Sequence, residues 1–142
     1  MKKEDVRLYH QIQKNTQTLM DTLEIMNARI YDKNLSMEAS REFMTFADIN
    51  NRALKALTEA SIEGYSTSGV QDILHRSSVQ IGSIVDNSTT HVADMLIQEQ
   101  SREVADVYRK MKHSNEDSAS TQLAKELVIF EEKNIERLKQ YL

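Results

Sequence analysis

Apolar side chains recur along this chain at alternating spacings of three and four residues, which is the period of an amphipathic α-helix. A β-strand would instead alternate with a period of two. The first stripe keeps this spacing without interruption and predicts a helix over residues 4–32. Its members are Tyr9, Ile12, Thr16, Leu19, Leu23, Met26 and Ile30.

A second stripe predicts a helix over residues 36–63. Ser36 is a good N-cap for it, Glu38 suits the positive end of the helix dipole, and Gly64 suits the C-terminal cap. The loop between the first two helices is short, which makes them antiparallel neighbours. The stripe consists of Phe43, Phe46, Asn50, Ala53, Leu57 and Ala60.

The middle of the chain allows two interpretations. A shorter apolar stripe covers residues 70–85, and the polar residues that follow offer an N-cap at Ser88 or Thr89. We therefore expect a break or kink at this point and a new helix over residues 89–112. The alternative is one long helix over residues 70–112, because the chain contains no proline and its last glycine is Gly82.

The closing part of the chain predicts one more helix, over residues 118–142, after a polar turn at residues 113–117. The predicted fold is all-α: an antiparallel up-and-down four-helix bundle with an extra or split helical segment between the second and third long helices. The length of 142 residues fits a single domain, residues 1–142. The absence of proline, which helix interiors exclude, agrees with this fold.

Composition and charge exclude several classes of protein. Without cysteine the chain has no disulfide, no thiol nucleophile and no zinc–thiolate site. Its 18 basic and 22 acidic residues give a net charge of −4, which is unfavourable for general nucleic-acid binding. No apolar run approaches the roughly 20 residues of a membrane span, and the charged first residues are unlike a secretion signal. We expect a cytoplasmic protein that binds neither nucleic acid nor membranes.

Each long helix carries a polar residue inside its apolar stripe, and these residues are Thr16, Asn50, Gln100 and Asn134. Residues equally far from a hairpin turn lie at the same level, so Thr16 should meet Asn50 and Gln100 should meet Asn134. Such buried polar residues can fix the register of the helices. The alternative is that they line a polar or metal-binding pocket in the bundle core.

Two acidic amphipathic segments, IQEQSREVADVY at residues 97–108 and LAKELVIFEEKNIERL at residues 123–138, resemble the last two helices of ferritin-like, rubrerythrin-type bundles. Residues 87–98 and 130–138 also resemble uncharacterised small helical proteins of Gram-positive bacteria, so we expect a bacterial source. The first resemblance implies a ferritin-like fold. Di-iron centres in such bundles use one Glu from each of two helices and Glu-x-x-His from each of the other two.

The di-iron motif itself is missing, because no Glu has a His three residues later. Asn134 stands where that His would follow Glu131, and the acidic residue that does have such a His is Asp72, before His75. The resemblance therefore implies the fold without oxygen-activating di-iron chemistry. Candidate ligands for another metal in the core are Glu99, Glu103, Glu131 and Asn134.

No catalytic constellation stands out. The four histidines are too far apart for a two-His ligand pair on one helix, and there is neither a nucleophile elbow nor a glycine-rich phosphate loop. We expect no cofactor and no enzymatic activity, and a helical bundle that acts through contacts with an unknown protein partner. The alternative is a degenerate ferritin-like protein that binds a metal ion or small ligand in its core. An exposed Met44 or neighbouring Phe would indicate a partner surface.

The first and last helices carry more apolar residues than one buried face needs. This excess predicts an exposed apolar patch, which soluble proteins commonly cover by two-fold association. We expect a homodimer through the outer face of residues 4–32 or of residues 118–142. The excess residues are Val6, Leu8, Met20 and Tyr31 in the first helix and Val128, Ile129, Ile135 and Leu142 in the last.

Overall fold

The predicted all-α four-helix bundle is confirmed. The structure is a computed structural model that describes residues 1–65 and 88–142, and the regular structure in these ranges is entirely helical. None of the helices in these ranges combines the length and apolar character needed to cross a membrane. The helices are α1 (Lys3–Asn27), α2 (Lys33–Glu59), α4 (Thr89–Met111) and α5 (Ala119–Leu138), and a short 3₁₀-helix, η1 (Lys139–Tyr141), follows α5.

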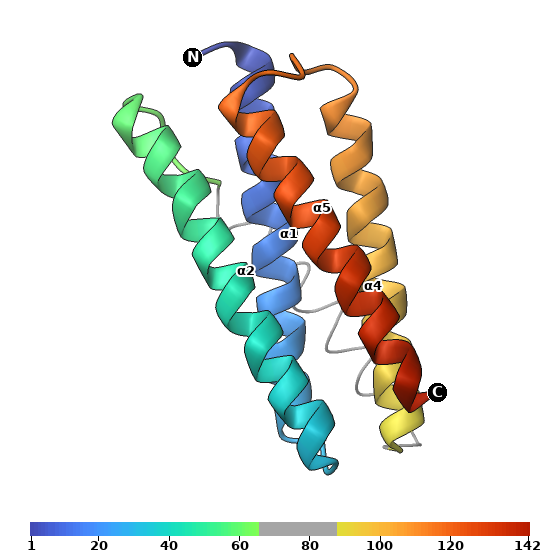
Figure 1. The fold of residues 1–142 in the computed structure, drawn as a ribbon. Coiled ribbons are helices and arrows are strands. Elements are labelled where there is room, and N and C mark those ends of the chain that lie inside the picture. Colours follow the sequence, from blue (N-terminus) through green and yellow to red (C-terminus); the bar gives the residue numbers. More distant parts are fainter. Residues whose placement is uncertain (66–87) are drawn as a thin grey trace.

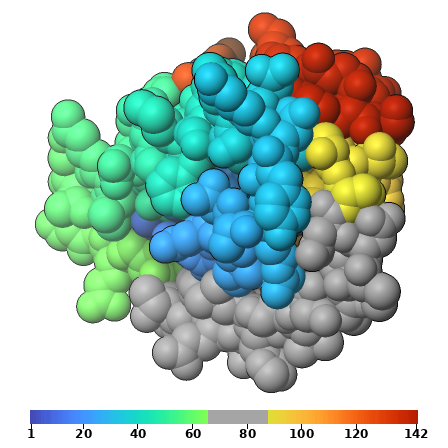
Figure 2. Space-filling view, turned by 90° about the horizontal axis from the view of Figure 1, so that it is seen from below, coloured from blue at the N-terminus to red at the C-terminus, as the bar shows by residue number. Residues whose placement is uncertain are grey.

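The directions of the helices are seen in Figure 1. α1 and α5 run one way along the bundle, and α2 and α4 run the other way. Each hairpin is therefore antiparallel, but the end of α2 and the start of α4 lie at opposite ends of the bundle. The order along the chain is not strictly alternating, because only the two short loops force consecutive helices to be antiparallel. In the end-on view of Figure 2, the start of α2 lies against the end of α1, and α4 lies beside α5.

Side-chain caps fix the start of three helices. Asp32 Oδ1 accepts a hydrogen bond of 2.9 Å from the backbone N–H of Leu35, so α2 begins at Lys33 rather than after the predicted N-cap Ser36. Asp and Ser are equally good N-caps, and the sequence alone does not rank them. Ser88 caps α4 with an extended backbone, as predicted, which excludes one continuous helix over residues 70–112. Ser118 caps α5 in the same way. The predicted 70–85 segment lies outside the described residues.

The C-terminal end of α2 is a Schellman motif. The N–H of Ile62 donates to the carbonyl of Leu57 (2.9 Å), and the N–H of Ser61 donates to that of Thr58 (3.0 Å). Ser61 takes the left-handed conformation at φ 59° that this motif requires. The helix thus ends before the predicted cap Gly64, just as α1 ends at Asn27 rather than at residue 32.

The core-facing stripe of α2 shares Phe46, Ala53 and Leu57 with the predicted one, but Glu42 and Ile49 are buried in place of Phe43 and Asn50. Phe46 is fully buried and packs edge-on against Phe130 of α5, with ring centroids 5.1 Å apart. Phe43 instead lies at the surface, and Glu42 takes the position facing the core. The buried residues of α2 are Leu35, Ala39, Glu42, Phe46, Ile49, Ala53 and Leu57.

Much of the apolar excess on the first and last helices is buried. Leu8 and Met20 of α1 and Val128 of α5 belong to the core that joins the four helices. Tyr31, beyond the end of α1, and Ile129 of α5 are exposed. None of the large apolar side chains within α1 is exposed, and the dimer through the outer face of the first or last helix stays a prediction.

Candidate functional site

Four buried polar side chains, one from each helix, lie in the same part of the core, where Glu131 interacts with the other three. We call Asn15 of α1, Glu42 of α2, Glu103 of α4 and Glu131 of α5 the buried acidic cluster. Asn15, Glu42 and Glu131 are 0 % exposed and Glu103 is 6 % exposed. Burying a charged carboxylate without a partner is costly, so this concentration of acids in a small core needs a physical explanation.

The three carboxyl groups of the cluster have strongly raised pKa values. Burial raises the pKa of Glu131 well above its ordinary value, and the neighbouring charge of Glu103 raises it further. Burial, followed by contact with Glu38, raises the pKa of Glu42 to about 8. Burial and the charge of Glu99 raise the pKa of Glu103 to about 8. Glu42 and Glu103, with pKa values of about 8, therefore hold their protons over most of the neutral range, and the pKa of Glu131 is shifted in the same direction.

Several polar atoms of the cluster have no hydrogen-bond partner in the structure. They include both carboxylate oxygens of Glu131, Oε2 of Glu42, Oε2 of Glu103 and both amide atoms of Asn15. Asn15 lies close enough to Glu131 to lower its pKa, although the two side chains form no hydrogen bond of normal geometry. Because buried polar groups in native proteins are nearly always paired, with protein, ordered water or a ligand, these atoms mark a candidate site in the core.

One edge of the cluster is held by hydrogen bonds. Gln100 Nε2 donates to Glu42 Oε1 at 2.7 Å, and Asn134 Nδ2 donates to Gln100 Oε1 at 3.1 Å. Arg41 and Arg137 both donate to Asn134 Oδ1. The amide pair that the sequence places at one level thus links the buried carboxyl of Glu42 to two arginines at the surface.

The other expected polar pair is separate from this cluster. Asn50 Nδ2 donates to Thr16 Oγ1 at 2.8 Å and lies 3.3 Å from the backbone oxygen of Gln13. Thr16 Oγ1 itself donates to the carbonyl of Ile12 at 2.8 Å. Both side chains are therefore satisfied within the α1–α2 hairpin, which suits a role in helix register rather than in binding.

The four candidate metal ligands have different surroundings. Glu103 and Glu131 belong to the buried acidic cluster, whereas the carboxylate of Glu99 is paired with Arg102. The amide of Asn134 is already hydrogen-bonded to its neighbours. Sequence reasoning missed Asn15 and Glu42. Glu42 lies on the spacing of three and four of the buried α2 residues, but hydrophobicity favours the neighbouring Phe43 as the core-facing residue.

The donor set does not fit a di-iron centre. Residues 1–65 and 88–142 contain no group of three or more acidic or histidine side chains already converged on one point. The cluster also offers oxygen atoms without a histidine, whereas ferritin-like di-iron sites require two. The donors are carboxylate and carboxamide oxygens, which suit hard cations such as Mg²⁺, Ca²⁺ and Mn²⁺.

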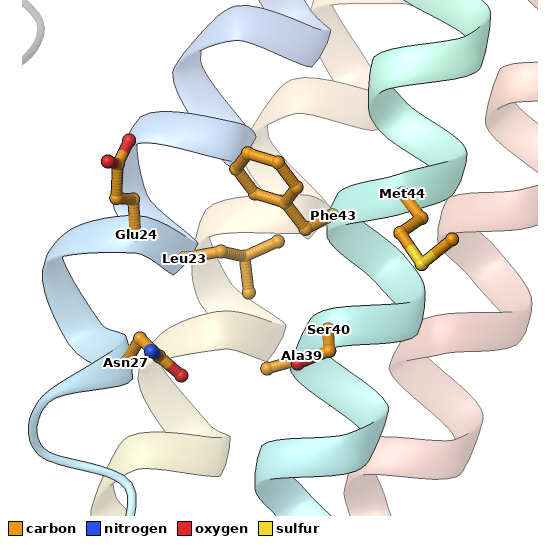
Figure 3. A pocket seen from close by; sticks show the side chains of 7 residues that line it. All are labelled: Leu23, Glu24, Asn27, Ala39, Ser40, Phe43 and Met44. Carbon is orange, nitrogen blue, oxygen red and sulfur yellow. The ribbon is translucent and has the colours of Figure 1, made fainter.

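A second feature lies at the surface between α1 and α2. This groove has a volume of about 300 Å³, and Leu23 of α1 lies opposite Ala39 of α2 within it. Phe43 reaches toward Leu23, while Met44 lies at the outer edge (Figure 3). Phe43 is 36 % exposed and Met44 is 72 % exposed, so these side chains are available for contact.

Comparison with models of protein families, with curated proteins and with solved structures finds no match for this chain. The core offers a buried group of acids with unpaired oxygens, and the surface offers an apolar groove.

Proposed function

We propose that the bundle binds a hard divalent cation, such as Mn²⁺, Mg²⁺ or Ca²⁺, in the buried acidic cluster. The observation that carries this proposal is Glu131, which is fully buried with both carboxylate oxygens unpaired. It also interacts electrostatically with Glu103 and Glu42 from two other helices. A divalent cation would neutralise these carboxylates and take the place of the protons that they otherwise retain.

The fold supports this proposal. The directions of the four described helices, with α2 and α4 running the same way, agree with the order of helix directions in ferritin-like bundles. Ferritin-like proteins place metal ligands on the inward faces of all four helices. The buried acidic cluster occupies such a position with a different donor set. On this proposal the chain is a divergent bundle that binds a cation through oxygen donors and has no di-iron chemistry.

Binding requires the side chains to converge, since they are not preorganised around one point. Glu42, Glu103 and Glu131 can move their carboxylates by changes of side-chain rotamer. Asn15 can add a neutral carbonyl oxygen, because both of its amide atoms are unpaired.

Titration of chelator-treated protein with Mn²⁺ tests the proposal. We expect a single saturable site in isothermal titration calorimetry, and its loss in the Glu131→Gln variant, which keeps the shape of the side chain. Glu132→Gln is the matched control, because Glu132 is an adjacent carboxylate on the surface of α5. The proposal is wrong if wild-type protein shows no saturable binding, or if Glu131→Gln binds as well as the control.

Contact with a protein partner, without enzymatic activity, is a second candidate function. The observation that favours it is the exposure of Met44 and Phe43 beside the α1–α2 groove. Exposed apolar side chains grouped at one place on a soluble protein commonly mark an interaction surface. Replacing Met44 with Glu should abolish such a contact without affecting the core.

A further inference from the structure

Basic side chains gather in a pocket between the first half of α1 and the end of α4. The pocket has a volume of about 200 Å³, and the described residues that line it include no acidic side chain. Most of the lining residues can carry a positive charge, although the chain as a whole has a net charge of −4. We call this site the basic pocket, and it is lined by Arg7, His10, Gln11, Lys14, Tyr65 and Lys110.

The helical period explains why these residues share one pocket. Arg7, Gln11 and Lys14 are separated by four and three residues, which places them on one face of α1. His10, three residues after Arg7 and four before Lys14, belongs to the same face. Lys110 comes from the last turn of α4, and it reaches this face because α1 and α4 are antiparallel and pack against each other.

The segment after α2 is fixed against α1 and forms one side of the basic pocket. Nε2 of His10 donates a hydrogen bond of 2.9 Å to the carbonyl oxygen of Glu63. The backbone N–H of Tyr65 donates to Oε1 of Gln13 at 2.8 Å. Gly64 allows this close approach, because a Cβ atom there would lie 2.8 Å from a side chain of α2. The pocket is therefore built by contacts between segments far apart in the sequence.

The cations of the basic pocket are not neutralised by the protein. Arg7, Lys14 and Lys110 form no ion pair within residues 1–65 and 88–142. Lys14 interacts electrostatically with Glu103, but the pKa of that carboxyl is raised to about 8, so it is mostly protonated at neutral pH. The pocket therefore concentrates positive charge that an anion could neutralise.

Gln11 gives a second, independent indication of a ligand. Its side chain is only 8 % exposed, and its Nε2 has no hydrogen-bond partner. Buried amide groups in native proteins are nearly always paired. Rotation about the last side-chain bond exchanges the two ends of the amide, so its N–H can turn toward an acceptor in the pocket. An anion bound beside Gln11 would satisfy this donor and the neighbouring cations together.

We propose that the basic pocket binds a phosphate group, either as inorganic phosphate or as the monoester of a small molecule. A phosphate monoester carries a charge of about −1.5 to −2 near pH 7 and offers several strong acceptor oxygens. The guanidinium of Arg7 can donate two parallel hydrogen bonds to it, and Lys14 and Lys110 add point charges. The pocket is smaller than the roughly 300–1,000 Å³ of sites for drug-sized ligands, which suits a small anion. This inference does not depend on cation binding in the core.

Titration with inorganic phosphate, followed by nuclear magnetic resonance of isotope-labelled protein, tests the proposal. Sodium chloride holds the ionic strength constant, and a chelator keeps the core free of cations. We expect the side-chain amide signals of Gln11 to shift and saturate with phosphate. Lys110→Gln should weaken binding by about tenfold or more, because it removes one charge-assisted hydrogen bond. Lys33→Gln is the matched control and should bind like the wild type, since Lys33 is an exposed lysine at the other end of the bundle (Figure 1).

Wild-type shifts that do not saturate, or that chloride alone reproduces, would overturn the phosphate site. Equal binding by Lys110→Gln and Lys33→Gln would also overturn it, because the attraction would then come from the general charge of the surface. A parallel titration with methyl phosphate separates the two sources of the phosphate group. Tighter binding of methyl phosphate than of inorganic phosphate would support a monoester ligand, and weaker binding would support the free ion. The Mn²⁺ titration reports separately on the core site.

Discussion

At the scale of single residues, the buried carboxyl groups set how stability depends on pH. The pKa values of Glu42 and Glu103 are raised from 4.5 to about 8 in the folded chain. Their contribution to stability is fully present below the unfolded value of 4.5 and is lost as the pH rises toward 8. The pKa values of Glu38 and Glu126 are lowered instead. Their contribution to stability is lost as the pH falls below 4.5, outside the range between 4.5 and 8.

We therefore expect the cation-free protein to become less stable between about pH 5 and pH 8.5, by up to about 1.4 kcal/mol per pH unit for each group. Urea denaturation at several pH values, in the presence of a chelator, measures this change in the free energy of unfolding. Glu103→Gln should make the free energy of unfolding depend less on pH, and Glu132→Gln should leave its pH dependence unchanged. A free energy of unfolding that rises with pH across this range would contradict the assignment of raised pKa values.

A second prediction compares two neighbouring aromatic residues. Phe46 is 0 % exposed and packs on Phe130, whereas Phe43 is 36 % exposed at the groove. Phe46→Ala should cost about 3–5 kcal/mol of unfolding free energy, because it leaves a cavity in the core. Phe43→Ala should cost clearly less. Chemical denaturation of the two variants checks that Phe46 faces the core while Phe43 lies at the surface, and equal losses of unfolding free energy would argue against it.

The candidate site was only partly predictable at this scale. The meeting of Gln100 with Asn134 follows from their equal distance from a short turn, which needs no knowledge of side chains. The inclusion of Glu42 does not follow so simply. A stripe through Phe43 and one through Glu42 differ by a single residue, and hydrophobicity favours the former. The choice between Phe43 and Glu42 depends on packing between the hairpins, which the sequence does not express locally.

At the scale of helices, the end of α2 offers a direct test of its capping motif. Ser61 adopts the left-handed conformation at φ 59° that glycine adopts without strain. Ser61→Gly should therefore stabilise the protein by about 0.5–1 kcal/mol. Ser61→Val, with a β-branched side chain, should destabilise it. Thermal denaturation of both variants measures these changes in stability. A Ser61→Gly variant less stable than the wild type would contradict the Schellman motif at the end of α2.

The helices themselves were the most predictable feature. Long stripes with a period near 3.6 identify helices strongly, and Ser88 was found because a capping residue directly preceded a new stripe. The C-terminal ends of α1 and α2 were predicted less accurately than the helices themselves. The predicted end at Gly64 relied on glycine as the usual left-handed residue, whereas the chain uses Ser61 in that role.

At the scale of the whole molecule, the relation between the two hairpins determines the core. Short loops predict antiparallel pairs, but the direction of the second hairpin depends on contacts that lie far apart in sequence. In the observed arrangement of helix directions (Figure 1), the buried acidic cluster takes one polar residue from each helix. The proposed function is thus a property of the assembled bundle, and no local motif signals it.

A cation held between helices should stabilise the whole bundle. If Mn²⁺ binds only the folded chain, free Mn²⁺ at about one hundred times its Kd adds about 2.7 kcal/mol to the free energy of unfolding. We expect a clear rise in melting temperature for wild-type protein and for Glu132→Gln, and none for Glu131→Gln. The same rise in all three proteins would indicate binding to surface carboxylates instead.

The most direct measurement is anomalous X-ray diffraction from crystals grown with Mn²⁺. The proposed function predicts an anomalous peak inside the bundle, within bonding distance of Glu131 and of at least one carboxylate from α2 or α4. It also predicts that this peak is absent from crystals of the Glu131→Gln variant grown in the same way. An empty core in the wild-type crystals, with manganese only at surface carboxylates or nowhere, would contradict the claim that the buried acidic cluster binds a cation.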